Sequence, residues 1–325
     1  MSRNIRIVFM GTPEFAVASL GSLLMNGYNV AGVVTAPDKP AGRGRSLTRS
    51  AVKQFSEFSH LPILQPENLK DPHFLKALKE LKPDLIVVVA FRYIPEEVWS
   101  IPGLGTFNLH ASLLPQYRGA APVNHAIING EHTTGVTTFM IDSNIDTGSI
   151  LFREEVPVFA VENAGDLHDR LMRTGARLVI HTVKALIEGT VTPVPQKKFL
   201  KPGEIIRPAP KIFPLNCIID WKADPCKIRN LVRGLSPSPC ARTALRKGDE
   251  IILCKIFETH AEIKDHNLEP GTIDTDGKHF LRVACNGGFI SILSLQLPGR
   301  KRMSTVELLR GFQPEGYVIT DPETN

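Results

Sequence analysis

The chain has 325 residues, of which 42% are hydrophobic and 22% charged, and this composition excludes a disordered or fibrous protein. That length predicts two domains and a sizeable buried core. The 38 Lys and Arg residues exceed the 33 Asp and Glu residues by five, and a net charge of +5 permits a nucleic-acid partner without requiring one.

Targeting signals and cysteine spacing point to one compartment. The five cysteines form no C-x-x-C pair or other metal-ligand spacing, so we expect reduced thiols and no metal. The first residues run straight into a strand-like stretch without the apolar segment of a signal peptide. No apolar run is long enough to span a bilayer. We therefore expect a cytoplasmic protein without a membrane partner. We also expect a monomer.

Short apolar runs alternate with helix-like stretches in the first half of the chain. Strands are predicted over residues 5–10, 30–35, 84–90 and 106–110, and a helix over residues 13–25. The run from Leu85 to Val89 is continuously apolar, which is typical of a strand covered on both faces. This alternation predicts an α/β fold with a doubly wound, mainly parallel, Rossmann-like sheet.

The pattern changes over residues 191–210. Five prolines interrupt any regular element there and lysines add positive charge, so we predict a semi-extended linker. Beyond it, short β-like runs at 250–257, 278–284 and 288–297 predict a small β-barrel or sandwich, and we favour an OB-like barrel. The expected organisation is a catalytic domain over residues 1–190, the linker, and a second domain over residues 211–325.

A glycine turn follows the first predicted strand, where a Rossmann fold puts its phosphate loop. Gly11 stands alone, so the G-x-G-x-x-G fingerprint is missing, and Thr35 occupies the position of the acidic residue that would bind ribose. Both observations disfavour a nicotinamide-dependent dehydrogenase. The favoured interpretation is a tight turn at Gly11, with Thr12 capping the helix and Pro13 in its first position.

An Asn, a His and an Asp form a candidate catalytic group. Asn108 and His110 are two residues apart on a predicted strand, so their side chains share a face, and Asp146 follows in a turn-rich loop. The trio suits acyl transfer to an amine. Asn108 and a protonated His110 can stabilise the oxygen that becomes negative. Asp146 can orient His110 or accept the amine proton, and no Ser or Cys has the setting of an activated nucleophile.

The pattern alone leaves a structural interpretation open, because a single His on a strand is more often a packed residue and an Asp in such a loop usually shapes a turn. The longer sequence around these residues resembles the signature of the folate-dependent formyltransferase family. That signature is the run FNLHASLLPQYRGAAP at residues 107–122, and Asp146-Thr147-Gly148 resembles the second family motif.

The resemblance implies a formyltransferase fold and a catalytic role for Asn108, His110 and Asp146. It implies 10-formyltetrahydrofolate as formyl donor and no metal. The residues that would border the folate are Ser112, Leu113, Leu114 and Pro115.

Further stretches resemble the branch of the family whose acceptor is methionyl-initiator tRNA. They are FMGTPEF at 9–15, PDKPAGRGR at 37–45, NLVRGLSP at 230–237 and LLRG at 308–311. The resemblance thus covers nearly the whole chain, whereas the purine branch resembles only the first domain. It implies formyl transfer to the amino group of the tRNA-bound methionine, for translation initiation, and a tRNA-binding role for residues 211–325.

The stretch at 37–45 is also a basic loop. Gly42 and Gly44 allow many backbone conformations, while Lys39, Arg43 and Arg45 supply positive charge. Such a segment can follow phosphates and become ordered on binding. We predict that these three cations bind tRNA, and a solvated surface loop is the alternative.

One stretch departs from the family pattern. After Ser236-Pro237 the family carries an aromatic residue and then Pro-Gly, whereas this chain has Ser238-Pro239-Cys240, which puts a packing or RNA contact there in doubt. Two other functions stay open. A formyltransferase for an amino-sugar nucleotide is often fused to a dehydrogenase domain, which this sequence does not contain. The intact trio argues against a non-catalytic folate- or RNA-binding protein.

Overall fold

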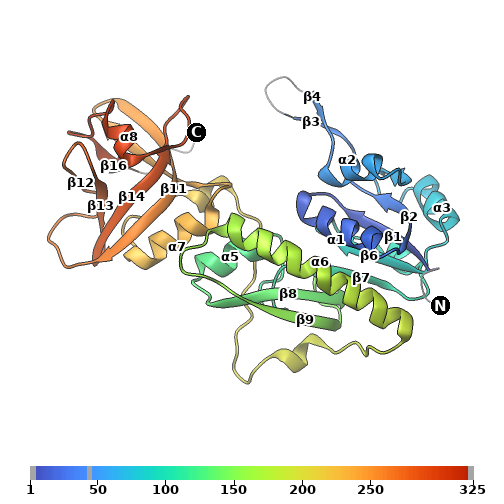
Figure 1. Ribbon diagram of the computed structural model, residues 1–325. Coiled ribbons are helices and arrows are strands. Elements are labelled where there is room, and N and C mark those ends of the chain that lie inside the picture. Colours follow the sequence, from blue (N-terminus) through green and yellow to red (C-terminus); the bar gives the residue numbers. More distant parts are fainter. Residues whose placement is uncertain (1–4, 42–45, 321–325) are drawn as a thin grey trace. The chain divides into compact units, whose positions relative to one another are not determined.

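The computed structural model describes residues 5–41 and 46–320, and its chain forms two compact units (Figure 1). The first unit comprises Met1–Gly119, Thr133–Pro157 and His168–Ala209. The second comprises Ala120–His132, Val158–Leu167 and Pro210–Asn325. The proline-rich residues up to Ala209 thus make their contacts with the first unit. In the parts of the chain that are described, no helix combines the length and apolar character needed to cross a membrane.

The first unit is built on a sheet with the strand order β5-β2-β1-β6-β7-β8-β9 among the described residues. Neighbouring strands from β5 to β7 are parallel, whereas β8 and β9 are antiparallel additions at one edge. This arrangement confirms the prediction of a mainly parallel α/β sheet. The strands are β1 (Arg6–Gly11), β2 (Asn29–Val34), β5 (Ile63–Leu64), β6 (Leu85–Val89), β7 (Thr106–His110), β8 (Thr133–Met140) and β9 (Ile150–Pro157). A separate hairpin joins β3 (Lys39–Ala41) to β4 (Ser46–Thr48).

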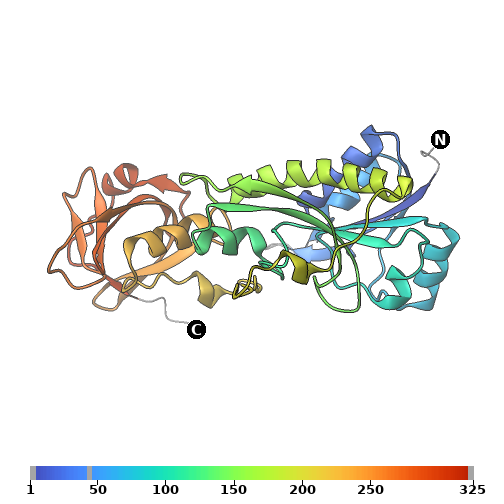
Figure 2. The same cartoon turned by 90° about the horizontal axis from the view of Figure 1, so that it is seen from below.

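Helices cover both faces of this sheet (Figure 2). Val8 and Met10 of β1 form one buried cluster with apolar residues of α3 and α4, among them Phe74 and Val98. The long helix α6 runs along β8 and β9 on the opposite face, where Thr138 and Thr182 share a hydrogen bond of 2.8 Å. The helices of this unit are α1 (Glu14–Met25), α2 (Ala51–Phe58), α3 (Pro72–Glu80), α4 (Glu96–Trp99), most of α6 (Ala164–Glu188) and the 3₁₀ turn η1 (Gln196–Phe199).

The turn after β1 differs in detail from the prediction. Helix α1 begins at Glu14, with Pro13 as its N-cap and no side-chain capping bond, so Thr12 lies one residue too early to act as the cap. Gly11 is needed for close packing. A Cβ atom there would lie 2.7 Å from the Cβ of Ala16 and 3.0 Å from the carbonyl oxygen of Val89. The glycine therefore lets α1 and β6 approach β1.

The second unit is an antiparallel, nearly closed barrel, which confirms the OB-like prediction. Its strand order over the described part of the chain is β12-β13-β14-β11-β10-β16, with β15 beside β14. The two ends of this order approach each other, since a Cβ atom on Gly271 would lie 3.6 Å from the Cβ of Ile319 in β16. The strands are β10 (Ala241–Lys247), β11 (Glu250–Ile263), β12 (Ile273–Thr275), β13 (Leu281–Cys285), β14 (Gly288–Gln296), β15 (Met303–Ser304) and β16 (Val318–Thr320).

Helix α7 (Pro225–Leu235) closes the core of the barrel. Ile228, Val232 and Leu235 lie on one face of this helix and pack with buried strand residues such as Ile256 and Leu295. Asp224 caps the helix by accepting a hydrogen bond of 2.9 Å from the backbone N–H of Lys227. The remaining helices of this unit are α5 (Pro122–Ile128), the 3₁₀ turn η2 (Pro214–Cys217) and α8 (Thr305–Leu309).

The departure from the family pattern falls directly after α7. Cys240, at the position where the family resemblance implies glycine, has a φ of 73°, in the left-handed region that favours glycine. Its side chain is buried, and its Sγ donates to the carbonyl oxygen of Pro237 at 2.7 Å. The backbone thus keeps the conformation of a glycine turn at a residue that has a side chain.

Candidate active site

His110 is the last residue of β7 and is 7% exposed. Its Nε2 lies 2.8 Å from the carbonyl oxygen of Tyr117. A carbonyl oxygen can only accept, so Nε2 carries the proton in that bond, and Nδ1 is the nitrogen that can act on other groups. Asn108 lies two residues earlier on the same face of the strand and is half-buried, as the sequence predicts.

Asp146 lies beside His110. Its Oδ2 is 3.9 Å from the Nδ1 of His110, and the Asp146 side chain is only 13% exposed. The same oxygen accepts a hydrogen bond of 3.0 Å from the backbone N–H of Gly119. A separation of 3.9 Å is within ion-pair range, so the carboxylate can stabilise a protonated His110 by its charge. The structure therefore brings His110 and Asp146 together, as the predicted mechanism requires.

The loop that carries Asp146 folds back to reach this position. In the antiparallel pair of β7 and β8, Phe107 faces Met140 and His110 faces Thr137, so the loop leaves β8 at the far end from His110. Its base is closed by a hydrogen bond of 2.9 Å from the N–H of Met140 to the carbonyl of Ser149. Asp146 itself has a φ of 55°, in the left-handed region.

The predicted folate residues follow β7 directly, and their side chains are buried or half-buried in the protein interior. Ser112 is fully buried and its Oγ donates to the carbonyl of Gln116 at 2.6 Å. Leu114 is also fully buried and packs with Phe139. Pro115 is buried and Leu113 is half-buried. A ligand beside this segment would meet mainly its backbone and the side chain of Leu113.

A hydroxyl group in β8 fixes that segment. Thr137 Oγ1 donates to the carbonyl of Ser112 at 2.6 Å and accepts from the N–H of Leu114 at 3.1 Å. Because Thr137 also pairs with His110 in the sheet, one residue sets the backbone on both sides of the turn.

Gln196 is a site residue that sequence reasoning missed. It lies in the segment predicted as a linker and is 4% exposed. Its Nε2 donates to the carbonyls of Asp146 and Gly148, each at 2.9 Å. Its Oε1 accepts two hydrogen bonds from the guanidinium of Arg118, at 3.1 and 2.7 Å. The partners are 48 to 78 residues away in sequence, so no local pattern marks this residue.

Residues 204–209, which we call the strap, hold the other side of the site. The N–H of Tyr117 donates to the carbonyl of Arg207 at 2.7 Å, and the N–H of Ala209 donates to the carbonyl of Arg118 at 2.7 Å. Gln116 adds a bond of 2.8 Å to Glu204. The backbone N–H of Lys201 and the side chain of Gln116 together lower the pKa of the Glu204 carboxyl. Tyr117, which accepts from His110, and Arg118, which directly precedes the donor Gly119, are thus held by a distant part of the chain.

Of the three predicted tRNA-binding cations, one is described. Lys39 is exposed in β3, where it pairs with Thr48 of β4. Arg43 and Arg45 lie outside the described residues. At the base of this hairpin, Asp38 forms an ion pair of 2.5 Å with Lys53, and Gln65 donates to the same carboxylate at 2.9 Å.

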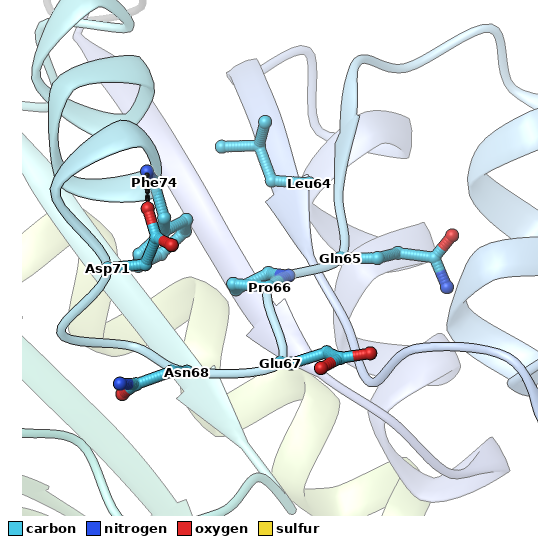
Figure 3. Close-up of a pocket in the computed structure, with 7 residues that line it drawn as sticks. All are labelled: Leu64, Gln65, Pro66, Glu67, Asn68, Asp71 and Phe74. Carbon is cyan, nitrogen blue, oxygen red and sulfur yellow. Dashed lines mark hydrogen bonds between the residues drawn. The ribbon is translucent and has the colours of Figure 1, made fainter.

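A cavity of about 520 Å³ lies elsewhere in the first unit (Figure 3). Leu64 and Phe74 form its apolar side, while the carboxylate of Asp71 is engaged with the backbone N–H of Phe74 at 3.2 Å. The guanidinium of Arg92 donates to the carbonyls of Pro66 and Glu67 at its rim. The lining contains none of the predicted catalytic residues.

The arrangement at β7 can perform acyl transfer without a nucleophilic side chain. His110 offers a nitrogen toward Asp146, and Asn108 offers an amide donor on the same face of the strand. Amide and imidazolium donors are the groups that stabilise a developing oxyanion, while a carboxylate orients an imidazole or accepts a proton. Over the described ranges, no three His, Cys, Asp or Glu side chains are grouped to hold a metal ion.

Comparisons with known proteins agree in both units. The formyl transferase family matches residues 4–183, and the family of its C-terminal domain matches residues 211–313. The methionyl-tRNA formyltransferase of Bacteroides fragilis is 54% identical over 310 residues, which are 95% of each chain.

Solved structures share the fold at low sequence identity. The N-formyltransferase from Helicobacter canadensis, in complex with folinic acid and dTDP-3-aminofucose, has a TM-score of 0.64 at 19% identity, covering 89% of this chain and 98% of that one. HypX from Aquifex aeolicus in complex with tetrahydrofolic acid has a TM-score of 0.62 at 18% identity, covering 94% of this chain and 47% of that one.

The tight base of the Asp146 loop gives a stability prediction. A Cβ atom on Gly148 would lie 1.6 Å from the carbonyl oxygen of Met140, which is backbone and cannot rotate away. Gly148→Ala should therefore lower the free energy of unfolding by about 2–3 kcal/mol, measured by urea denaturation. Gly103→Ala is the matched control, because a Cβ atom there has no neighbour within 4 Å, and it should change stability by less than about 0.5 kcal/mol. Equal effects would contradict the close packing.

Proposed function

The chain belongs to the methionyl-tRNA formyltransferase family, and from this premise we propose that it transfers the formyl group of 10-formyltetrahydrofolate to the amino group of methionyl-initiator tRNA. The product would be formylmethionyl-tRNA for translation initiation. The observation that carries the proposed chemistry is the approach of Asp146 to His110 at the end of β7, which supplies a carboxylate and an imidazole to one reacting centre.

In the first step, the amine nitrogen of methionine bonds to the formyl carbon and the carbonyl oxygen becomes negative. Asn108 and a protonated His110 donate hydrogen bonds to that oxygen, and each such donor contributes a factor of roughly 10²–10³ in rate. Because Nε2 of His110 is engaged with Tyr117, the donated proton comes from Nδ1. Asp146 lies close enough to orient this imidazolium.

In the second step, the bond from the formyl carbon to N10 of the folate breaks. The attacking nitrogen loses a proton and N10 gains one, so the reaction needs no external acid or base. Asp146 accepts the amine proton, directly or through one water, and then returns it toward N10. No covalent enzyme intermediate forms.

We assign the donor and the acceptor to different parts of the chain. The folate lies against the backbone of Ser112 to Pro115 and the side chain of Leu113. The tRNA binds Lys39, Arg43 and Arg45 and the second domain, residues 211–325. We further infer a monomer that works without a metal in the cytoplasm, where charged tRNA is present. We also propose that the catalytic domain ends at residue 190 and that the second domain begins at residue 211.

Acceptor choice tests the proposal directly. The purified protein and 10-formyltetrahydrofolate are incubated with either methionyl-initiator tRNA or a dTDP-linked amino sugar, and formylated product is quantified. We expect formylmethionyl-tRNA and no formylated sugar. The reverse result would assign the amino-sugar alternative, and no product from either acceptor would make the protein a binding module. The likeness to the sugar enzyme of Helicobacter canadensis concerns the fold alone.

Asp146→Asn tests the proton-transfer role. The amide keeps the size of the carboxylate and can still accept the bond from Gly119, so the fold should persist. Turnover should fall by roughly 10²–10⁴-fold, because an amide cannot accept the amine proton or balance an imidazolium. Formyl transfer is followed in single turnover, with the melting temperature as control. Turnover near that of the wild type would remove Asp146 from the chemistry.

Arg43→Ala tests the basic loop. Arg43 stands between two glycines and is expected to leave stability unchanged within about 0.5 kcal/mol. Loss of a charge-assisted bond to phosphate should weaken transfer to methionyl-tRNA by about 1–3 kcal/mol while folate binding stays the same. The effect should shrink as salt rises, since phosphate contacts are screened.

Lys76→Ala is the charge-matched control for that variant. It removes one cation from α3 outside the proposed tRNA-binding set, where Lys76 is 78% exposed and 3.9 Å from Glu80. Transfer rates should match the wild type. If Arg43→Ala and Lys76→Ala behave alike, the loop is a solvated surface.

A further inference from the structure

We propose that Gln196 is a positioning residue that holds Asp146 beside His110. This inference rests on the proposed function and adds a residue from outside the two family motifs. The amide of Gln196 makes four hydrogen bonds, two to the carbonyls of Asp146 and Gly148 and two from Arg118. One buried side chain thereby joins the Asp146 loop to the segment that follows β7.

The amide of Gln196 has no unused capacity. A glutamine side chain has two N–H donors and one carbonyl oxygen with two lone pairs, and all four are engaged at 2.7 to 3.1 Å. The residue is only 4% exposed, so water cannot easily replace a lost partner. The group is therefore fixed in one orientation, with its nitrogen toward the Asp146 loop and its oxygen toward Arg118.

The Asp146 loop needs such an external hold. Asp146 has a φ of 55°, in the left-handed region, which costs free energy for residues other than glycine, although less for Asp than for most. Two residues later, Gly148 lies against the backbone of Met140 without room for a Cβ atom. The N–H donors of Gln196 bind the carbonyls on both sides of Thr147. These bonds fix the peptide planes that orient the Asp146 side chain.

The carbonyl oxygen of the Gln196 side chain acts, through Arg118, on the hydrogen bond between Gly119 and Asp146. Arg118 directly precedes Gly119, whose N–H donates to Asp146 Oδ2 at 3.0 Å. The carbonyl of Arg118 is in turn held by the N–H of Ala209 in the strap. Gln196 therefore fixes both partners of the Gly119–Asp146 hydrogen bond. A loop shift of about 1 Å at such a place can cost on the order of 100-fold in rate.

Two substitutions at Gln196 distinguish the role of its N–H donors from the role of its carbonyl oxygen. Gln196→Glu keeps the shape and the acceptor for Arg118 but places an oxygen against the two loop carbonyls, so the donors are lost. Gln196→Met removes donors and acceptor together. We expect both variants to lower kcat by about 10- to 100-fold, with KM for folate and for methionyl-tRNA nearly unchanged, because the interaction affects the reacting geometry rather than ground-state binding.

Asn26→Asp is the matched control. The side-chain amide of Asn26, at the C-cap of α1, donates to the carbonyl of Ser22 at 2.8 Å, without a described bond to the Asp146 loop. Its substitution likewise replaces an N–H donor by an oxygen facing a backbone carbonyl, and it should leave kcat unchanged. Melting temperatures are measured for all variants. If Gln196→Met does not fold, the isosteric Gln196→Glu decides the matter.

A second readout does not depend on formyl transfer. Hydrogen exchange of the Gly119 amide, followed by NMR, should become faster in both Gln196 variants and stay slow in Asn26→Asp. Wild-type kcat in a folded Gln196 variant would overturn the proposal. An active Gln196→Glu variant beside an inactive Gln196→Met variant would also overturn it, because only the contact with Arg118 would then affect the rate. If the wild type itself shows no transfer, the proposed function fails, and Gly119 exchange alone tests the positioning.

Discussion

The pairing of β7 with β8 determines where the Asp146 loop starts, and the site depends on how that loop returns. Since Phe107 faces Met140, the loop begins away from His110 and must cross back over the sheet. Two local features make the return possible, the close contact of Gly148 with Met140 and the left-handed backbone of Asp146. Neither makes a strong contact with His110 itself. The Asp146 loop is therefore positioned by contacts at its base and by distant partners more than by contacts with His110.

Local sequence patterns predicted β1, β2, β6 and β7, but not β5, β8 or β9. The apolar run in β6 and the alternation of polar and apolar residues in β7 are local features of the sequence, so these strands and the shared face of Asn108 and His110 could be predicted. The place of Asp146 followed from the family resemblance, because a turn-rich loop alone does not say which way it folds. Thr12 shows the limit at element ends, where a shift of one residue moved the N-cap to Pro13.

The pairing of the proline-rich stretch with the first unit could not be predicted from local sequence, for a physical reason. The prolines predict an extended chain, and the structure adds the short 3₁₀ turn η1 at Gln196–Phe199. An extended chain can either connect domains or pair with one of them. Here its backbone pairs with Tyr117 and Arg118, and Val194 bridges Ile150. Those partners are tens of residues away, and their bonds use backbone groups that every residue possesses. Gln196 contributes a buried side chain, and its polarity in a proline- and lysine-rich stretch resembles that of an ordinary solvated residue.

The proposed catalytic trio cannot determine which acceptor is used. Attack on a formyl group needs an amine, a donor for the oxyanion and a proton acceptor, and these requirements are the same for an amino sugar and for an aminoacyl ester. Discrimination must therefore come from residues that touch the rest of the acceptor. In tRNA that remainder is a charged polymer, so its recognition should weaken with salt, whereas the geometry of His110 and Asp146 should not.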